Sequence, residues 1–285
     1  MPELPEVETV VRTLNWLVAG KIIDQVSVLL PRIIKQPAAP EAFAAALAGQ
    51  TIRSIERRAK FILFRLDGLT LVSHLRMEGR YGVYQTDEPV EKHTHVIFRL
   101  KDGTELRYRD VRQFGTMQIF RTGEESNLPP LHKLGLEPLD PSFTVAALVG
   151  RIGDKPTKLK PLLLNQEAIA GLGNIYVDES LHRAGLHPER PANSLSAREM
   201  KKLHEAIRAV LQEAVDAGGS SIKSYVNGQG EMGMFQQQLL VYGQSGKPCR
   251  TCGHLIEKMR LGGRGTHYCP KCQKLPRTRG TKLAQ

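Results

Sequence analysis

Apolar residues in the first segment of the chain recur at the spacing of one helix face. They lie at Val7, Val10, Val11, Leu14, Leu17 and Val18, and Gly20 follows them. A repeat of three and four residues that ends at a glycine predicts a helix over residues 6–19. The apolar face of this helix would attach the N-terminus of the chain to a hydrophobic core.

The next hundred residues contain short runs rich in β-branched and aromatic residues. We expect strands at residues 22–30, 51–56, 60–66, 69–75, 81–84, 95–100, 104–109 and 116–120. Asp67-Gly68 and Asp102-Gly103 predict tight hairpins between neighbouring strands. Only residues 41–47 predict a helix here. Many short strands with close turns favour an antiparallel β-sandwich or barrel over a doubly wound sheet.

The pattern becomes helical after a proline-rich stretch, residues 122–141, that predicts a linker. Helices are expected at residues 158–170, 174–184 and 196–217. Ser196 and Glu199 have the spacing of a capping box at the start of the last helix. Its buried stripe would comprise Leu203, Ile207, Val210, Leu211 and Ala214. The glycine-rich segment that follows, residues 218–235, predicts a loop that is mobile unless it binds something.

Composition limits the classes of function. The 285 residues include 40 Lys and Arg against 29 Asp and Glu, a net charge of +11 that favours a polyanionic partner. Charge alone does not distinguish DNA, RNA and a membrane surface. The chain has no apolar stretch of membrane-spanning length and no secretory signal pattern, so the expected location is cytoplasmic.

The four cysteines predict a structural zinc site. Cys249 and Cys252 form one Cys-x2-Cys knuckle, and Cys269 and Cys272 form a second one after sixteen residues. Such spacing places four thiolates around one zinc ion and leaves no ligand position open for chemistry. Between the knuckles, glycines flank Arg264, so a tight turn would present this arginine to a phosphate.

The N-terminus offers an amine and an acid side by side. Removal of Met1 would make Pro2 the first residue, with a secondary amine in place of an amide. An α-amino group titrates near ~7.7 to 8, against ~10.4 for a lysine, so much more of it is neutral and nucleophilic at pH 7. Glu3 is placed to exchange protons with whatever the amine attacks. This pairing suggests imine chemistry, although many chains begin with Met-Pro for no catalytic reason.

Further polar and apolar residues have two interpretations each. The glycines before Asn174 suit either a capped helix start or a phosphate-binding helix N-terminus. Lys60 belongs to a basic cluster that is otherwise expected to be a solvated face. Met77, Arg112 and Phe114 provide a plug, a hydrogen-bond donor and a wedge for a duplex that has lost a base. From the residues alone, Met77 and Phe114 fit a hydrophobic core at least as well.

Together these motifs resemble the formamidopyrimidine-DNA glycosylase family, bacterial enzymes of base-excision repair. The resemblance rests on the start Pro2-Glu3-Leu4-Pro5-Glu6, on residues 172–179, which resemble the family's helix-two-turn-helix signature, and on Thr266-His267-Tyr268-Cys269-Pro270. It implies an α+β protein of two domains. The first is an N-terminal β-sandwich domain over residues 1–130 with flanking helices. A helix-two-turn-helix domain over residues 131–237, a β-hairpin zinc finger over residues 238–275 and a disordered tail over residues 276–285 follow. DNA would bind in the cleft between the domains.

The resemblance also implies an activity. The expected substrate is duplex DNA containing oxidised purines, notably 8-oxoguanine and formamidopyrimidines, and one structural zinc ion is the only cofactor. Pro2 would attack the sugar C1′ while Glu3 protonates the ring oxygen, and β,δ-elimination would then cut the strand. The chain would act as a monomer.

Roles for other residues follow from the same resemblance. Lys60, His74, Asn174, Tyr242 and Arg264 would bind phosphates, and Lys60 would also tune Glu3. Met77, Arg112 and Phe114 would fill the void left by the extruded nucleotide. Within the loop 218–235, the residues expected to contact the damaged base are Ser220, Ile222, Lys223, Ser224 and Tyr225. Gln113 departs from the basic residue expected at its position, which puts one phosphate contact in doubt.

Two alternatives remain open at this level. The chain could be a non-catalytic nucleic-acid-binding protein that senses damage through its basic surface and zinc ribbon. It could also act on oxidised pyrimidines, like the related endonuclease VIII family. That family usually begins Pro-Glu-Gly-Pro, so Leu4 favours the purine branch.

Overall fold

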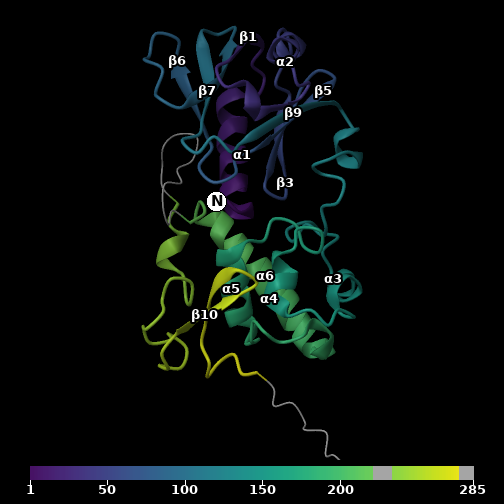
Figure 1. Ribbon diagram of the computed structural model, residues 1–285, viewed down its shortest axis with the longest axis vertical. Helices are drawn as coiled ribbons and strands as arrows, with labels where there is room; N and C mark the ends of the chain where they lie inside the picture. Colours follow the sequence, from purple (N-terminus) through teal and green to yellow (C-terminus); the bar gives the residue numbers. More distant parts are fainter. Residues whose placement is uncertain (221–232, 276–285) are drawn as a thin grey trace, which may run out of the picture. The chain divides into compact units, whose positions relative to one another are not determined.

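The computed structural model describes residues 1–220 and 233–275 (Figure 1). The chain divides into two compact units. The first comprises Met1–Glu137 and Leu211–Gln238, and the second comprises Pro138–Val210 and Leu239–Gln285.

The first unit is built on two β-sheets. The four-stranded sheet has the order β1 (Ile23–Val28), β7 (Thr94–Leu100), β8 (Thr104–Arg109), β6 (Arg80–Gln85). The five-stranded sheet has the order β2 (Ile34–Gln36), β9 (Thr116–Arg121), β5 (Leu69–His74), β4 (Phe61–Arg65), β3 (Ser54–Arg58). All pairs are antiparallel except β2 with β9, which is parallel. The expected sandwich and its two Asp-Gly hairpins are therefore confirmed, and the parallel edge strand β2 is an addition.

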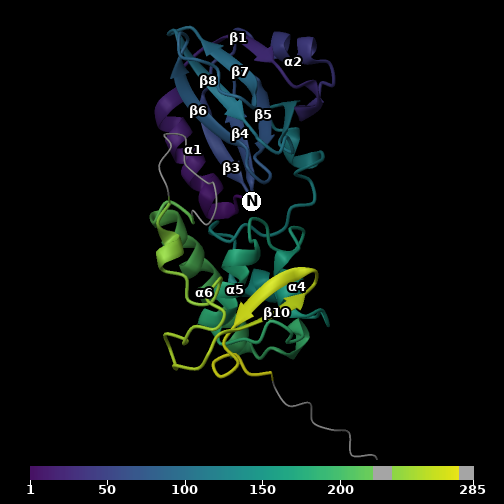
Figure 2. The same ribbon diagram turned by 60° about the vertical axis from the view of Figure 1, so that its left-hand side comes forward.

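The two sheets face each other across the hydrophobic core. Tyr81 of β6 donates a hydrogen bond to Ser73 of β5 at 2.7 Å, and its ring meets that of Phe64 of β4 edge-on at 5.5 Å. Helix α1 (Leu4–Val18) packs against β3 and β4 (Figure 2) and buries the predicted apolar face. Helix α2 (Pro40–Leu47) packs beside β1. The N-terminus is therefore attached to the sandwich core, as the apolar pattern predicted.

The second unit contains short helices and a β-hairpin. The helices are α3 (Val145–Ile152), α4 (Leu159–Leu164), α5 (Asn174–Ala184) and α6 (Ala197–Asp216), and residues of α6 from Leu211 onward group with the first unit. Strands β10 (Glu257–Leu261) and β11 (Arg264–Tyr268) form the hairpin, which packs against α5 through β11. This unit also contains a single 3₁₀ turn at Ala192–Ser194, and the first unit contains such turns at Pro31–Ile33, Glu125–Asn127 and Phe235–Gln237.

The structure corrects two helix predictions. The helix expected over residues 158–170 ends at Leu164, because the Asn165 side chain accepts the Glu167 N–H at 2.9 Å and turns the chain. Ala168, Ile169 and Ala170 are buried in the loop that follows, so their apolar character did not mark a helix. Helix α3 was not predicted. It begins where the Thr144 hydroxyl accepts the Ala147 N–H at 3.1 Å.

Other helix predictions are confirmed. The Ser196 N–H donates to Glu199 at 2.9 Å and the Glu199 N–H donates to the Ser196 hydroxyl at 3.4 Å, so the capping box forms. The predicted apolar stripe of α6 is buried throughout. Within the described ranges, no helix is both long enough and apolar enough to span a bilayer.

Candidate active site and zinc centre

Pro2 and Glu3 lie immediately before the first residue of α1. Both are buried, and the Glu3 side chain is only 5 % exposed, whereas Met1 ahead of them is 47 % exposed. The Glu3 backbone N–H donates to the Glu6 carboxylate at 2.8 Å. The packing of α1 therefore places the predicted acid next to the predicted nucleophile, and leaves Met1 accessible for removal.

Glu6 connects this N-terminus to the glycine-rich loop. It is 2 % exposed, and its second carboxylate oxygen accepts the backbone N–H of Ser220 at 2.7 Å. Gly219 has a φ of +81°, and a Cβ there would lie 3.0 Å from Cγ of Glu6. Glycine is therefore needed for both the backbone conformation and the close approach. The link from Glu6 to Ser220 spans 214 positions of sequence, and no sequence motif pointed to it, although Glu6 stands one helical turn after Glu3.

The two ends of the loop are hydrogen-bonded to each other. The Met234 N–H donates to the Ala217 carbonyl and the Phe235 N–H donates to the Gly219 carbonyl, both at 3.0 Å. Ser220 is 5 % exposed. The other predicted loop residues, Ile222, Lys223, Ser224 and Tyr225, lie outside the described residues, as does the predicted tail.

Lys60 directly precedes β4, and His74 ends β5 opposite Phe61, the first residue of β4. Lys60 and His74 are each 6 % exposed, and the positive charge of Lys60 is close enough to disfavour protonation of the His74 ring. Burial, with the nearby charges of Arg76 and Lys60, lowers the pKa of His74 to about 3. The His74 Nδ1 accepts the Arg76 backbone N–H at 2.9 Å. A neutral ring with an accepting Nδ1 keeps its proton on Nε2, which can donate to a phosphate.

Asp110 organises the loop that carries Arg112 and Phe114. Its fully buried carboxylate accepts the backbone N–H groups of Arg112 at 3.1 Å and of Phe114 and Gly115 at 2.8 Å each. Phe114 is 53 % exposed, and the Arg112 guanidinium lies over its ring at 5.1 Å. Met77 is 37 % exposed. The hydrophobic-core interpretation of Met77 and Phe114 is therefore wrong.

Gln113 holds the side chain of Arg32 beside this loop. Its side-chain carbonyl accepts a hydrogen bond from the guanidinium of Arg32, which belongs to a different segment of the same unit. Gln113 itself has a φ of +59°. The described residues include no carboxylate paired with Arg32, so Arg32 brings a positive charge to the side chain of Gln113.

In the second unit, Asn174 bonds the backbone of Gly265, the residue after Arg264. The Gly265 carbonyl accepts the Asn174 amide at 3.0 Å and the Lys160 ammonium at 2.8 Å. Lys160 is fully buried and pairs with Asp178 at 2.7 Å. These contacts attach the hairpin to the N-terminus of α5, the positive end of the helix dipole. No sequence motif pointed to Lys160 as an anchor.

The turn of this hairpin has the form predicted for it. Leu261 pairs with Arg264, and the two residues between them, Gly262 and Gly263, have φ values of +57° and +75°. Two central residues with positive φ require glycine in such a turn. Arg264 is exposed at its end.

Tyr242 is positioned by Glu179 of α5. The buried Glu179 carboxylate accepts the backbone N–H groups of Leu240 and Val241 at 2.9 Å and of Tyr242 at 2.8 Å. The Tyr242 ring meets that of His267 edge-on at 5.0 Å. The three phosphate-binding candidates of this unit, Asn174, Tyr242 and Arg264, are therefore all held by contacts among α5, the hairpin and the segment that follows Leu239.

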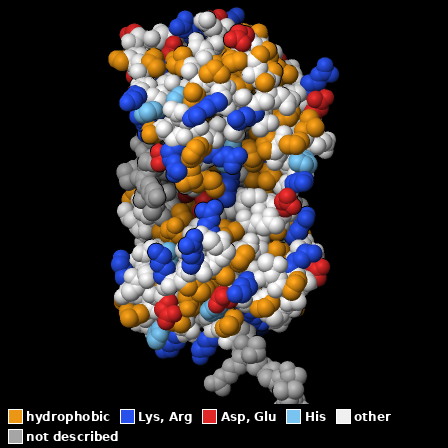
Figure 3. All heavy atoms as spheres, viewed as in Figure 1, with side chains coloured by type: hydrophobic (Ala, Val, Ile, Leu, Met, Phe, Trp, Pro, Cys, Tyr) orange, Lys and Arg blue, Asp and Glu red, His pale blue; other side chains and the backbone are white. Residues whose placement is uncertain are grey.

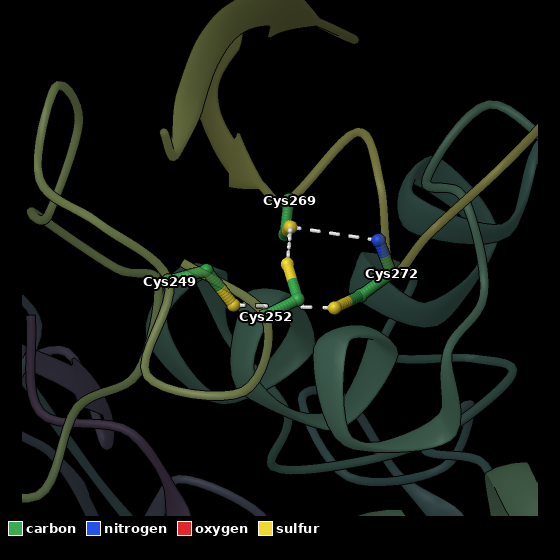
Figure 4. A group of neighbouring side chains, drawn as sticks. All are labelled: Cys249, Cys252, Cys269 and Cys272. Carbon is green, nitrogen blue, oxygen red and sulfur yellow. Dashed lines mark hydrogen bonds between the residues drawn. The ribbon is translucent and has the colours of Figure 1, made fainter. Parts of the chain in front are cut away.

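The four cysteines meet the requirements of one zinc ion. Their Sγ atoms all lie within 4.8 Å of one another, with 3.5 Å between Cys252 and Cys269 and 4.0 Å between Cys249 and Cys272 (Figure 4). A tetrahedral site with Zn–S bonds of about 2.3 Å places sulfurs roughly 3.8 Å apart. Burial raises the pKa of the Cys249 thiol, but backbone N–H groups and the His182 ring outweigh this effect and lower it to about 6. The predicted structural zinc site is confirmed.

The remaining surface agrees with a polyanionic partner. On the face shown in Figure 3, Lys and Arg side chains outnumber Asp and Glu side chains. His93 and His95 belong to no metal-binding cluster among the described residues. His95 instead bonds the Asp110 carbonyl at 2.9 Å.

Family models match nearly the whole chain. The model described as the formamidopyrimidine-DNA glycosylase N-terminal domain matches residues 1–117. The H2TH domain of the same enzyme matches residues 134–226, and a zinc finger found in FPG and IleRS matches residues 246–275.

Individual proteins agree with these models. The formamidopyrimidine-DNA glycosylase of Brevibacillus brevis is 66 % identical over 96 % of this chain and 99 % of that protein. The Bacillus subtilis enzyme of the same name is 58 % identical, again over 96 % of this chain and 99 % of its own length. A Lactococcus lactis FPG mutant in complex with DNA containing Fapy-dG has a TM-score of 0.90 at 40 % identity and covers 96 % of this chain and 100 % of its own. The Lactococcus lactis Fpg with DNA containing an abasic site has a TM-score of 0.89 at 40 % identity and the same coverage.

Proposed function

The chain belongs to the formamidopyrimidine-DNA glycosylase family, and from this membership we infer that it is a DNA glycosylase and AP lyase of base-excision repair. Its substrate is duplex DNA containing oxidised purines, such as 8-oxoguanine and formamidopyrimidines. Membership of an enzyme family disfavours the alternative of a non-catalytic binder. The protein acts as a monomer, in the cytoplasm, where bacterial DNA is found.

We propose that the Pro2 nitrogen is the nucleophile once Met1 has been removed. The neutral amine attacks C1′ of the damaged nucleotide and a C1′–N bond forms. The bond from C1′ to the base breaks, and the base leaves with the bonding electrons and takes up the proton that the amine releases. Glu3 donates a proton to the sugar ring oxygen, which opens the ring and leaves an imine between Pro2 and the sugar. The single observation that supports this best is the buried Glu3 next to Pro2, with its backbone held by Glu6.

Strand cutting follows from the imine. The imine acidifies C2′, so loss of a proton there expels the 3′ phosphate, and a second elimination expels the 5′ phosphate. Hydrolysis then frees Pro2. Every step is a substitution, a proton transfer, an elimination or a hydrolysis, so none requires a redox cofactor. The zinc ion, bound by Cys249, Cys252, Cys269 and Cys272, supplies folding free energy for the hairpin and takes no part in the reaction.

Five residues bind the phosphates around the extruded nucleotide. Lys60 and His74 do so from the first unit, and Asn174, Tyr242 and Arg264 do so from the second. His74 donates from Nε2 as a neutral ring, whereas Lys60 and Arg264 contribute positive charge. The charge of Lys60 also tunes the acidity of Glu3.

Three exposed side chains of the first unit occupy the duplex where the nucleotide was. Met77 plugs the space, Arg112 donates to the orphaned base, and Phe114 wedges beside it. Their exposure and the stacking of Arg112 on Phe114 support this role. Ser220, with the loop residues Ile222, Lys223, Ser224 and Tyr225, contacts the damaged base.

Borohydride trapping tests the nucleophile. Reduction of the imine should leave this protein covalently bound to a duplex containing 8-oxoguanine, and tryptic mass spectrometry should locate the sugar remnant on Pro2. A panel of oxidised purine and pyrimidine duplexes in the same assay separates the proposed specificity from that of the endonuclease VIII family. Efficient trapping by a protein whose Met1 is retained would overturn the assignment of Pro2.

A further inference from the structure

His182, in the last turn of α5, lies against the zinc centre. Its Nε2 is 3.5 Å from Sγ of Cys249, and the residue is 6 % exposed. Among the described residues, the group whose ligand atoms gather closely enough for one metal ion contains the four cysteines and not His182. His182 therefore touches a zinc ligand without belonging to the ligand set.

The other ring nitrogen of His182 determines where the proton lies. Nδ1 is buried and has no hydrogen-bond partner in the described structure. A proton on Nδ1 would be a buried, unpaired N–H donor, which costs free energy. A proton on Nε2 instead points at the sulfur, a good acceptor when it is a thiolate. The arrangement favours an Nε2–H donor to the Cys249 thiolate.

We propose that His182 is a positioning residue of the zinc centre, whose Nε2–H bond to Cys249 Sγ holds this thiolate on the metal. Groups that donate to metal ligands commonly tune the stability of the metal site. A donated hydrogen bond draws electron density from the thiolate and makes it a weaker nucleophile. Cys249 should therefore be the zinc ligand that reacts last with an electrophile.

This bond has a structural consequence along α5. The same helix carries Asn174 at its start. Further along it, Asp178 accepts the backbone N–H of His267 and Glu179 accepts that of Tyr242. His182 adds a contact from the opposite end of α5 to the first cysteine knuckle. Both ends of α5 are thus attached to the zinc finger, the start through Asn174 and the end through His182. This inference does not depend on the catalytic assignment of Pro2.

The chain provides an internal reference for the test. Cys269 is as inaccessible as Cys249, with exposed fractions of 0 % and 2 %, but in the described structure the His182 ring contacts Cys249. Alkylation by iodoacetamide forms an S–C bond and releases iodide, and the modified sulfur dissociates from zinc. Cys269 Sγ accepts the Cys272 backbone N–H at 3.5 Å, so the two sulfurs also differ in their backbone donors. The change in the ratio of Cys249 to Cys269 alkylation when His182 is altered, measured by mass spectrometry during partial reaction of the zinc-loaded full-length protein, therefore isolates the effect of the histidine.

We expect Cys249 to react more slowly than Cys269 in the unaltered protein. His182→Phe keeps the ring but removes the donor, and should raise the Cys249 to Cys269 ratio roughly three- to tenfold, the effect of one net hydrogen bond. Zinc release to a chromogenic chelator during the reaction should accelerate in parallel. His182→Gln, which retains an N–H donor, should restore part of the protection.

His204→Phe is the matched control. Its ring stacks on Phe143 and its Nε2 bonds the Phe143 carbonyl at 2.6 Å, away from the cysteines. This variant should leave the alkylation ratio unchanged. Equal reactivity of Cys249 and Cys269 in the unaltered protein would overturn the proposal even if His182→Phe fails to fold. An unchanged ratio in a folded His182→Phe variant would do the same.

Discussion

Glu6 accepts the backbone N–H of Ser220 at 2.7 Å with one carboxylate oxygen, while its other oxygen accepts the Glu3 N–H at 2.8 Å. One buried side chain thus joins the proposed acid to Ser220 of the glycine-rich loop, although Glu6 and Ser220 are 214 positions apart in sequence. Correct placement of the loop and of Glu3 should therefore depend on the same carboxylate.

Glu6→Gln should slow removal of 8-oxoguanine much more than cleavage of a preformed abasic site. The amide replaces one acceptor by an NH2 group, so one of the two backbone N–H groups loses its partner. Such a loss costs about 1–3 kcal/mol, or roughly five- to a hundredfold in rate. Single-turnover kinetics on both substrates provide the measurement. Glu8→Gln, which alters a partly exposed ion pair on the same helix, is the control. Equal losses on the two substrates would argue against a role in placing the loop.

Glu3→Gln should abolish base removal while sparing strand cutting at a preformed abasic site. A glutamine cannot donate the proton that opens the sugar ring, but an abasic sugar already presents an aldehyde to Pro2. The expected loss in base removal is at least about a hundredfold. Release of 8-oxoguanine at the normal rate by the Glu3→Gln protein would refute the role of Glu3 as the acid.

Arg264→Ala should weaken binding to duplex DNA and reduce its salt dependence. Each phosphate contact releases about one condensed counterion, so the slope of log K against log salt should fall by about 0.9. Fluorescence anisotropy at several salt concentrations measures the slope. An unchanged slope would count against a phosphate contact by Arg264.

Arg32→Gln should have a similar effect on the slope, because Arg32 brings its charge to the loop of Gln113. Gln113→Ala should weaken binding less, since it loosens the guanidinium but keeps its charge. Gln113→Lys in the Arg32→Gln background should restore the slope. If Arg32→Gln binds DNA with the original slope, the cation beside Gln113 does not contact phosphate.

His74 should make the first unit less stable as the solution is acidified. The unfolded chain binds a proton on this histidine as the pH falls through 6.5, whereas the folded chain binds it only near the lowered pKa of about 3. Its contribution to stability is therefore full above pH 6.5 and is lost progressively between pH 6.5 and pH 3. Between pH 7 and pH 5 the loss is about 2 kcal/mol.

Urea unfolding at pH 7 and pH 5 checks this expectation. His74→Asn should lose less stability between the two pH values than the unaltered protein does. His132→Asn, at an exposed position, should behave like the unaltered protein. An identical pH dependence for His74→Asn would show that His74 titrates normally in the fold.

The sequence predicted those elements whose signal is local. The strand over residues 104–109 was predicted correctly because an Asp-Gly turn precedes an alternating run, and the zinc site because four cysteines have a specific spacing. Helix α3 was missed because it follows a proline-rich stretch and its cap is a single threonine. The helix at residues 158–170 was predicted too long because Ala168–Ala170 are buried without being helical.

The supporting residues of the site could not be predicted in this way. Glu6, Asp110, Lys160 and His182 act on backbone groups or a sulfur that the fold brings to them, and three of these contacts cross long stretches of sequence. A pattern within the sequence does not reveal such partners. Among the residues predicted through resemblance, Phe114 and Arg264 have exposed side chains, whereas Glu3, Lys60 and His74 are buried.

The paired ends of the glycine-rich loop suggest an engineering route. Hydrogen bonds from Met234 and Phe235 to Ala217 and Gly219 close the base of this segment independently of what lies between. The intervening stretch can therefore be exchanged as a cassette, with altered length and composition, while its attachment points stay in place. Because we propose that this loop contacts the damaged base, libraries built in this way should change which modified bases are removed without redesigning the scaffold.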